Sequence, residues 1–558
     1  MEMTVAEALV ECLERENVEV VFGYPGGAVL PLYDALYHST RIKHVLVRHE
    51  QGGAHAADGY ARVSGKVGVC IGTSGPGATN LVTGIANAYM DSVPLVVITG
   101  QVPTIQVGTD AFQEVDITGI TLPITKHNYL LKDPAKLATV VKNAFHIAAT
   151  GRPGPVLIDI PKDVAQARIS FKYPSTVRLR GYKPTYKGHP NKIAEIARLM
   201  TKAKRPVIYA GGGVIASEAS EELLKLAEAI SAPVTNTFMG LAGFPGDHPL
   251  FLGMLGLHGT RYANLAITEC DLLIGIGARF DDRVVMNINS FAPHATVVHI
   301  DIDPAEIGKV IATHVPLVGD VKTILKELLP LIEKVDRSEW LERIQSLKAQ
   351  YPLGYERGGS LKPQFIIEEL WNCTKGDAII VTDVGQHQMW VAQYYHFKKP
   401  RTLISSGGLG CMGFGLPASV GAALAAPSGS KVVLVTGDGS IQMTIQELAT
   451  MMEQCLSVKI ILLNNSALGM VRQLQEYYCQ GRHMATNFEF HPDFEILAKA
   501  YGIPAYTFRT EEEVLKGLPE ILESPGPALV NCIVSAEENV LPMVPAGKGI
   551  GETVECAK

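Results

Sequence analysis

The sequence has no long apolar run, no closely paired cysteines and no cluster of basic residues. No apolar segment reaches the ~20 residues of a membrane-spanning helix. The nine cysteines form no Cys-x-x-Cys pair, which argues against a zinc site or a disulfide framework. The 49 basic residues are outnumbered by 56 acidic ones, so a broadly basic nucleic-acid binder is excluded. With no signal or transit pattern at the N-terminus, we expect a cytoplasmic protein bound to neither membrane nor nucleic acid.

Glycine and short apolar runs are plentiful. A length of 558 residues predicts three or four domains, and 47% apolar residues exclude an intrinsically disordered chain. Short apolar runs such as Leu95–Thr99 and Val432–Val435 alternate with helical stretches. Because runs without polar alternation suit parallel strands covered on both faces, the sequence predicts doubly wound α/β domains.

Composition divides the chain into three blocks. Residues 181–190 are rich in proline, glycine and lysine and resemble a linker, and charged helical sequence at 339–349 leads into the third block. We expect an N-terminal domain at 1–180, a central domain at 190–335, a C-terminal domain at 360–540 and an irregular tail at 541–558.

The first and third blocks share one layout. Residues 68–99 and 432–465 each give a strand, a glycine-rich turn, a helix and a second strand. This likeness indicates either a duplicated domain or only the features that all α/β units share, and the residues leave both interpretations open.

The clearest chemical signal is Gly437-Asp438-Gly439-Ser440, with Asn465 following 27 positions after Asp438 (465 − 438). Glycine lets the backbone approach a phosphate closely. Asp438 and Asn465 offer oxygen ligands suited to Mg²⁺, which prefers few protein ligands completed by phosphate and water. Both residues follow strands, and ligands of open α/β sheets bind at the carboxyl ends of strands. Each motif alone is a common turn, but together they predict a magnesium–diphosphate site.

With this motif pair the chain resembles the thiamine diphosphate enzymes over its whole length, and among them most closely the catalytic subunits of acetohydroxyacid synthases. Further segments that carry the likeness are 22–27, 48–51, 278–284, 412–417 and 542–545. The resemblance implies three α/β domains, of which the first and third bind thiamine diphosphate and the middle one binds FAD. It also implies Mg²⁺ as the third cofactor.

The activity implied by the resemblance is decarboxylation of pyruvate on thiamine diphosphate. The two-carbon unit is then joined to a second 2-keto acid, pyruvate or 2-ketobutyrate, which gives 2-acetolactate or 2-aceto-2-hydroxybutyrate. We therefore expect a role in branched-chain amino acid biosynthesis, although the sequence does not distinguish it from a fermentative role.

Glu50 matches the carboxylate that activates the cofactor in this family. It follows the apolar run 44–47, so it is expected at a strand end. A carboxylate bonded to the aminopyrimidine ring would favour the tautomer that takes the thiazolium C2 proton. Its presence also disfavours glyoxylate carboligase, a similar enzyme that lacks this glutamate.

The family likeness also implies which residues contact thiamine diphosphate and which bind the metal. Met412 is expected to lie beneath the cofactor and hold it bent. The whole set expected at thiamine diphosphate is Glu50, Val384, Gly385, Gln386, His387, Gly410, Met412, Gly437, Asp438, Gly439, Ser440, Asn465 and Met470. The expected metal ligands are Asp438, Asn465 and the backbone of Ala467.

The middle block carries glycine-rich turns at strand ends, which suit a dinucleotide, although a Gly-Gly-Gly turn alone is weak evidence. The resemblance implies that FAD contacts Arg152, Gly212, Gly213, Leu257, His258, Gly259, Thr260, Gly277, Arg279, Asp281, Arg283, Asp301, Ile302 and Asp320. Because the family's net reaction is not a redox reaction, we expect the flavin to be structural or vestigial.

The substrate site implied by the family comprises Gly27, Phe112, Gln113, Lys162 and Arg283. The Gly27 amide would meet an oxyanion, and Arg283 would bind the second substrate's carboxylate bidentately. Leu474 departs from the family, where many members carry tryptophan at this position, a residue associated with preference for 2-ketobutyrate. We expect a weaker acceptor preference in this chain.

The resemblance implies a homodimer as the smallest active unit, or a dimer of dimers, with the cofactor between the first domain of one subunit and the third domain of its partner. A separate small regulatory subunit is a further expectation. Two alternatives stay open: a related decarboxylase or flavin-linked pyruvate oxidase, and a non-catalytic protein of the same fold. Intact Glu50, Asp438 and Asn465 argue against the second.

Overall fold

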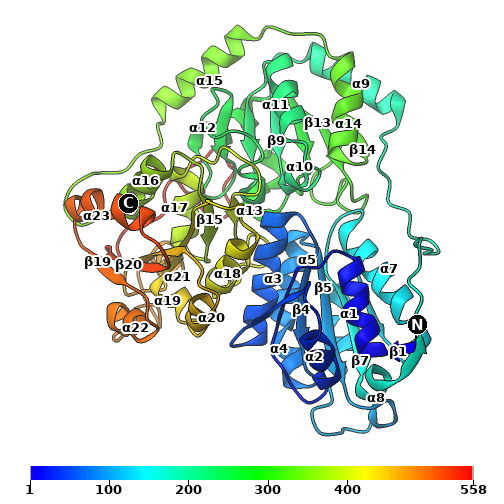
Figure 1. Cartoon of the computed structure of the whole chain (residues 1–558). Coiled ribbons are helices and arrows are strands. Elements are labelled where there is room, and N and C mark those ends of the chain that lie inside the picture. Colours follow the sequence, from blue (N-terminus) through cyan, green and yellow to red (C-terminus); the bar gives the residue numbers. More distant parts are fainter. Residues whose placement is uncertain (1, 556–558) are drawn as a thin grey trace.

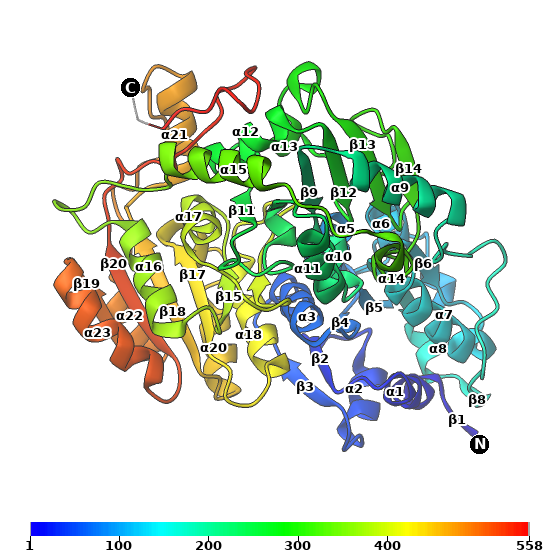
Figure 2. The same cartoon turned by 90° about the horizontal axis from the view of Figure 1, so that it is seen from above.

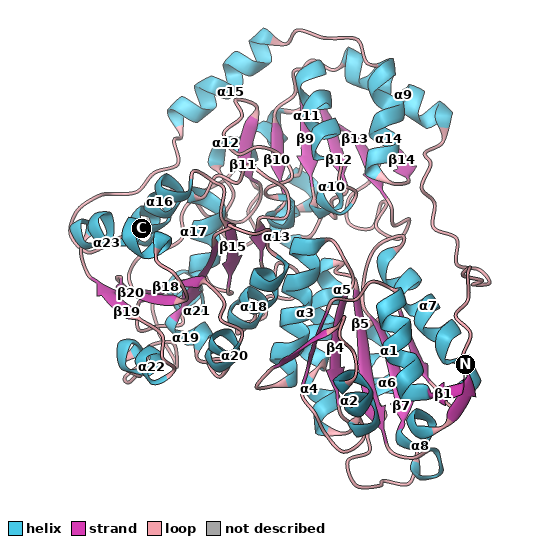
Figure 3. Cartoon of the chain, in the orientation of Figure 1, coloured by secondary structure: helices cyan, strands magenta, loops and turns pink. Residues whose placement is uncertain are grey.

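Three six-stranded sheets follow one another along the chain (Figures 1 and 3). The computed structural model describes residues 2–555. In Figure 1 the first sheet lies at the lower right, the second at the top and the third at the lower left. Every strand pair within the three sheets is parallel, and helices cover them. The predicted α/β class with parallel sheets is therefore confirmed.

The first domain has the sheet order β3-β2-β4-β5-β7-β6. Its parallel strands are β2 (Val20–Gly23), β3 (Lys43–Leu46), β4 (Gly68–Gly72), β5 (Leu95–Gln101), β6 (His127–Leu130) and β7 (Val156–Pro161). A separate antiparallel pair joins β1 (Glu2–Thr4) to β8 (Arg168–Ser170). The α-helices are α1 (Val5–Arg15), α2 (Leu30–Tyr37), α3 (Glu50–Ser64), α4 (Pro76–Asn80), α5 (Val82–Asp91), α6 (Ile117–Thr121), α7 (Leu137–Ala149) and α8 (Lys162–Gln166).

The third domain has the order β16-β15-β17-β18-β20-β19. Its strands are β15 (Ile379–Thr382), β16 (Leu403–Ile404), β17 (Val432–Gly437), β18 (Val458–Asn464), β19 (Ala505–Phe508) and β20 (Ala528–Ile533). Its helices are α16 (Pro363–Thr374), α17 (Gln386–Tyr394), α18 (Gly415–Ala425), α19 (Asp438–Ile441), α20 (Glu447–Glu453), α21 (Gly469–Tyr478), α22 (Phe494–Ala500) and α23 (Glu511–Glu523). Counted along its own chain, each of the two domains has the order 2-1-3-4-6-5. The shared order favours the duplicated-domain interpretation.

The middle domain has a different order, β11-β10-β9-β12-β13-β14, which reads 3-2-1-4-5-6. This is the order of dinucleotide-binding sheets, whose ligands lie where the order reverses. Its strands are β9 (Pro206–Ala210), β10 (Val234–Asn236), β11 (Phe251–Met254), β12 (Leu272–Ile276), β13 (Thr296–Asp301) and β14 (Val315–Val318). Its helices are α9 (Pro190–Lys202), α10 (Gly212–Ala216), α11 (Ser220–Ala229), α12 (Arg261–Glu269), α13 (Asp282–Val285), α14 (Val321–Leu328) and α15 (Ser338–Gln350).

The first and third domains meet along α3 and α18, which lie side by side in both views (Figures 1 and 2). The helices cross so closely that glycine is required at the contact. A Cβ on Gly421 would clash with the Ala56 carbonyl oxygen, and a Cβ on Gly59 would clash with that of Ala418. Backbone therefore packs directly on backbone, which leaves this interface almost no freedom to slide.

The tail after β20 is irregular, as predicted, but it is packed. Met543 and Val544 are fully buried, and an isolated bridge joins Met543 to Val554. The Val544 amide donates to the Leu257 carbonyl, so the tail ties the third domain to the middle one. Residues 556–558 of the predicted tail lie outside the described residues. Within residues 2–555, no helix is both long enough and apolar enough to cross a membrane.

Gly421→Val should destabilise the contact between the first and third domains. The new side chain would overlap the backbone of α3, and overpacking of this kind costs about 3 kcal/mol or more when no side chain can move aside. Ala423→Val, on the same helix but only half-buried, is the matched control for the β-branched residue. Thermal unfolding should show a clearly lower midpoint for Gly421→Val, and equal midpoints for the two variants would contradict the close crossing.

Candidate active site

The first domain gathers its predicted site residues at one edge of its sheet. Gly27 follows β2, Glu50 follows β3, Gln113 lies in the loop after β5, and Lys162 follows β7. Because the carboxyl ends of parallel strands share one edge, residues far apart in sequence are brought to the same side of the domain.

Glu50 is the first residue of α3 and is almost completely buried. His49 caps the helix by accepting from the Gln51 amide. The Glu50 carboxylate accepts a hydrogen bond of 2.9 Å from Asn80 Nδ2. Its other oxygen lies only 3.1 Å from where a Cβ on Gly77 would be. The helix N-terminus favours the negative charge, and Asn80 fixes its direction.

The loop after β5 leaves open space above the substrate residues. A Cβ on Gly27 would meet no atom within 4 Å. Phe112 is 89% exposed, so residues 2–555 leave it almost uncovered. Gln113 has a φ of 60° and packs its backbone against Gly75. Lys162 begins α8 at the same edge. These groups therefore lie in the loops and the helix start that follow the strands of the first sheet.

A buried carboxylate that the motifs do not predict, Asp383, organises the third domain's site. It accepts from the amides of Val384 at 2.9 Å, Gly413 at 2.8 Å and Gly415 at 3.3 Å. Burial raises the pKa of Asp383 to about 6. Ser440 Oγ donates to the Val384 carbonyl at 3.0 Å. Asp383 thus connects the end of β15 to the segment that carries Met412.

Asp438 and Asn465 fit a magnesium site. Asp438 is 1% exposed, and its Oδ2 has no hydrogen-bond partner among the described residues. Burial raises the pKa of Asp438 to about 6. The Asn465 oxygen accepts from the Ala467 amide at 3.1 Å, while its nitrogen faces Gln386 Oε1 at 3.4 Å. A buried carboxylate oxygen without a partner, beside an amide oxygen, is the ligand type that Mg²⁺ prefers.

The N-terminus of α17 completes this pocket. This helix begins shortly after β15, at the carboxyl edge of the sheet, and a helix N-terminus attracts phosphate. His387 is buried, its Nε2 has no partner among the described residues, and burial lowers its pKa to about 3. A neutral imidazole can donate one hydrogen bond to a phosphate oxygen. The predicted glycines border the pocket: Gly385, Gly410, Gly437 and Gly439.

The predicted selectivity residue Leu474 lies on α21, which is held by a buried amide. Gln473 is fully buried, receives a bond of 2.9 Å from Gln386 Nε2, and donates to the Val540 carbonyl at 3.0 Å. This connection runs from the metal pocket to the tail. Met470 and Leu474, on the same helix, line a neighbouring cavity.

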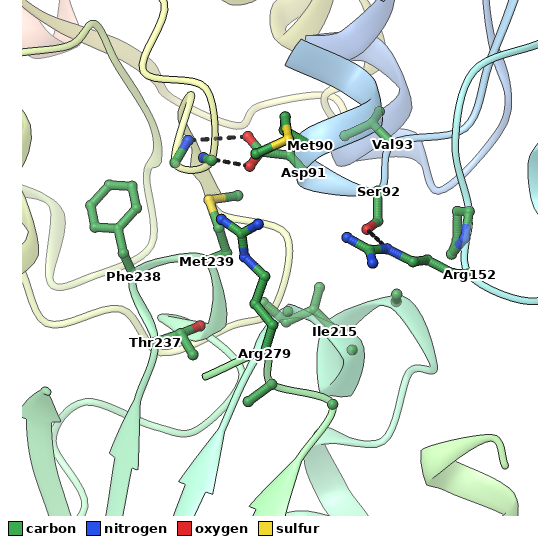
Figure 4. Close-up of a pocket in the computed structure, with 18 of the residues that line it drawn as sticks. Met90, Asp91, Ser92, Val93, Arg152, Ile215, Thr237, Phe238, Met239 and Arg279 are labelled. Carbon is green, nitrogen blue, oxygen red and sulfur yellow. Dashed lines mark hydrogen bonds between the residues drawn. The ribbon is translucent and has the colours of Figure 1, made fainter. Parts of the chain in front are cut away.

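That cavity has a volume of about 690 Å³ and is lined by all three domains. Figure 4 shows its walls, with Arg152 approaching from the first domain and Arg279 from the middle domain. Arg152 Nε donates to Ser92 Oγ at 2.8 Å, and its guanidinium pairs with Glu306 at 2.7 Å. The volume is within the range of cofactor pockets.

Most of the predicted flavin residues line the cavity, namely Arg152, Gly212, Gly213, Leu257, His258, Gly277, Arg279, Asp281, Arg283, Asp301, Ile302 and Asp320. Gly259 and Thr260 do not. Thr260 is buried and caps α12 by accepting a hydrogen bond from the Ala263 amide. It therefore supports the start of α12 without lining the cavity. A Cβ on Gly213 would clash with Gly277, so the turns after β9 and β12 touch at the point where the strand order reverses. The lining therefore fits a dinucleotide.

Within one chain, Glu50 faces away from the metal pocket. Gly52, Ala56 and Gly59 contact the third domain. At about 100° per residue, they lie roughly 180–240° around α3 from Glu50. Glu50 shares its side of the helix with Ala54, which packs against Gly84 of the first domain. Glu50 therefore lies on a different side of α3 from the residues that contact the third domain.

Sequence reasoning missed Asn80, Asp383 and Gln473. Asp383 follows an apolar run directly, which is the same signal that identified Asp438. Asn80 and Gln473 lie in ordinary helical sequence and acquire their contacts only in the folded chain, so no local pattern could have identified them.

Comparison with known proteins agrees with this architecture. Three family models match: the thiamine pyrophosphate enzyme N-terminal binding domain at residues 3–120, the central domain at 193–328 and the C-terminal binding domain at 383–532. The chain is 50% identical to the acetolactate synthase large subunit of Corynebacterium glutamicum, over 98% of this chain and 89% of that one. It is also 50% identical to a probable acetolactate synthase large subunit of Methanocaldococcus jannaschii (99% and 95%) and 48% identical to the acetolactate synthase large subunit of Buchnera aphidicola subsp. Schizaphis graminum (98% and 97%).

Proposed function

This chain belongs to the thiamine pyrophosphate enzymes, in the family of acetolactate synthase large subunits, and we propose on that basis that it is an acetolactate synthase. It decarboxylates pyruvate and joins the remaining two carbons to the carbonyl carbon of a second 2-keto acid. The observation that carries the proposal is the presence in one chain of a buried, oriented Glu50 and of a buried Asp438 whose Oδ2 lacks a partner among residues 2–555.

The chain binds the diphosphate end of its cofactor in the third domain. Asp438, Asn465 and the Ala467 carbonyl would hold Mg²⁺, and the amides at the start of α17 would face the phosphates. Met412 directly precedes Gly413, whose amide is held by Asp383, so its side chain would be a firm support for a bent cofactor.

Thiamine diphosphate, when bound, supplies a carbon nucleophile and an electron sink for the departing CO₂. Glu50 would hold a proton at the pyrimidine ring nitrogen of the bound cofactor. Asn80 keeps the carboxylate in one orientation, and the helix terminus stabilises its charge. Because Glu50 faces away from its own third domain, it serves the cofactor bound by a partner chain, and the smallest active unit is a homodimer.

The substrates are oriented by groups at the open edge of the first sheet and beside α21. A Cβ on Gly27 would meet nothing within 4 Å, and the Gly27 amide would donate to the developing oxyanion. Phe112, Gln113 and Lys162 border the same region. The Arg283 side chain is 74% exposed, and among residues 2–555 its one ion pair is a 3.7 Å contact with Asp282, so its guanidinium would be able to bind the second carboxylate.

The large cavity would hold FAD as a structural cofactor. Arg152, the glycine turns after β9 and β12, and Asp301 would contact it. The reaction transfers no net electrons, so the flavin has no redox step to perform. Its position between three domains suits a role in holding them together.

Two features support partner chains. Large apolar side chains near the site, Phe112 and Ile105, are more than four-fifths exposed and suit burial against a second copy. The relatives are named large subunits, which supports a separate small subunit that regulates this chain.

The product formed from pyruvate tests the proposal. The purified chain with Mg²⁺, thiamine diphosphate and FAD should release CO₂ and form 2-acetolactate. Glu50→Gln should lower kcat by about 100-fold or more, because positioned proton transfer contributes that much. Glu269→Gln, which alters an exposed pair with Arg343, is the matched control and should not change kcat. Acetaldehyde or acetyl phosphate as the main product would instead identify a decarboxylase or an oxidase.

Leu474→Trp should strengthen discrimination between acceptors. Leu474 lines the cavity beside Met470, and tryptophan would add an apolar wall where 2-ketobutyrate has one methylene more than pyruvate. One methylene in an apolar pocket is worth about 1–3 kcal/mol, so the ratio of acetohydroxybutyrate to acetolactate should rise by about tenfold. The measurement is direct competition between the two acceptors. A strong bias already present in the unaltered chain would contradict the role given to Leu474.

A further inference from the structure

One segment of the third domain borders both cofactor regions. Residues 405–412 run from the end of β16 to Met412. Gly407 and Gly408 line the large cavity. Four residues further on lies Met412, which the proposed function places at thiamine diphosphate. The conformation of this short segment therefore bears on both sites at once.

The segment is held from outside its own domain, by α5 of the first domain. Asp91 accepts from the Gly408 amide at 2.7 Å and from the Gly407 amide at 3.1 Å. Figure 4 shows both bonds at the cavity wall. The Asp91 side chain is only 1% exposed, so water does not compete for these amides.

A second contact holds the other part of the segment. Asn87, one helical turn before Asp91, accepts from Ser406 Oγ at 2.5 Å. The same hydroxyl accepts from the Cys411 amide at 2.8 Å, directly before Met412. Two residues on one face of α5 therefore fix the segment near both of its ends.

These contacts belong to a buried charged cluster. Arg62 pairs with Asp58 at 2.5 Å and with Asp91 at 2.8 Å, and Asn87 Nδ2 donates to Asp58 at 3.1 Å. Burying charges is costly, and well-packed apolar residues often give equal or greater stability. Stability alone therefore does not account for three charged residues at this place. The cluster does supply a fixed geometry for the two amides of the segment.

We propose that Asp91, supported by Arg62, is a positioning residue that presets residues 407–412 for both cofactors. This inference rests on the proposed function, because it assumes a flavin in the cavity and thiamine diphosphate beside Met412. Without Asp91, the segment has several conformations, and either cofactor must order it on binding. Both affinities then fall together, although Asp91 need not touch the thiamine cofactor.

The test uses the cofactor-free full-length protein and measures two dissociation constants separately. Fluorescence quenching gives the constant for thiamine diphosphate at saturating Mg²⁺, and calorimetry gives the constant for FAD. In Asp91→Asn both dissociation constants should rise about tenfold. An asparagine has one acceptor oxygen, which cannot replace the two carboxylate oxygens that accept from Gly407, Gly408 and Arg62. Asp271→Asn is the matched control. Asp271 also accepts two successive amides, those of Lys204 and Arg205 at 2.8 and 2.9 Å, but at the opposite end of β9 from the cavity.

Gly408→Ala provides an independent variant if Asp91→Asn does not fold. Its Cβ would lie 2.7 Å from Asp91 Oδ1 and 3.0 Å from Met90 Cβ, so it would push the segment away from α5. It should also weaken both cofactors. If only the FAD constant changes, or neither changes, Asp91 is no more than a cavity wall or an interdomain contact and the inference is wrong. If the unaltered protein binds neither cofactor, the proposed function fails instead.

Discussion

The close crossing of α3 and α18 is the constraint on which the rest of the structure depends. Glycine at the contact brings two backbones together, so the rotation of α3 about its axis is fixed. One side of α3 is used to join the domains. Glu50, on the other side, is turned toward the open edge of its own sheet and held there by Asn80. This packing contact is the basis of the proposal that a second chain completes the site.

The three sheets use one physical principle for three tasks. Each presents the carboxyl ends of its parallel strands, where loops and helix N-termini are free to bind ligands. The first and third sheets share one strand order and divide the binding of one cofactor between them. The middle sheet has the dinucleotide order and opens on the cavity between the domains. The segment held by Asp91 lies where these regions approach one another, so the order of one pocket is linked to the order of the other.

Sequence alone predicted much of this arrangement, because the chemistry depends on short motifs. The parallel sheets were predictable from the short apolar runs. Asp438 and Asn465 could be singled out because of their spacing and their positions directly after predicted strands. The identical order of the first and third sheets could not be decided, because a strand's neighbours are set by contacts distant in sequence. For the same reason Asp91 was not found: its partners are 316 and 317 positions away. Gly259 and Thr260 match the family's pattern, yet they are not among the residues that line the cavity.

Complementation between two inactive chains tests the shared site most directly. Chains carrying Glu50→Gln and chains carrying Asp438→Asn are co-expressed with different tags, and the mixed dimer is purified and assayed. If the two residues act on one cofactor from different chains, each mixed dimer holds one intact site and one doubly altered site, so about half of the normal activity per dimer returns. If both residues act from the same chain, each site of the mixed dimer carries one defect and activity stays as low as in either parent.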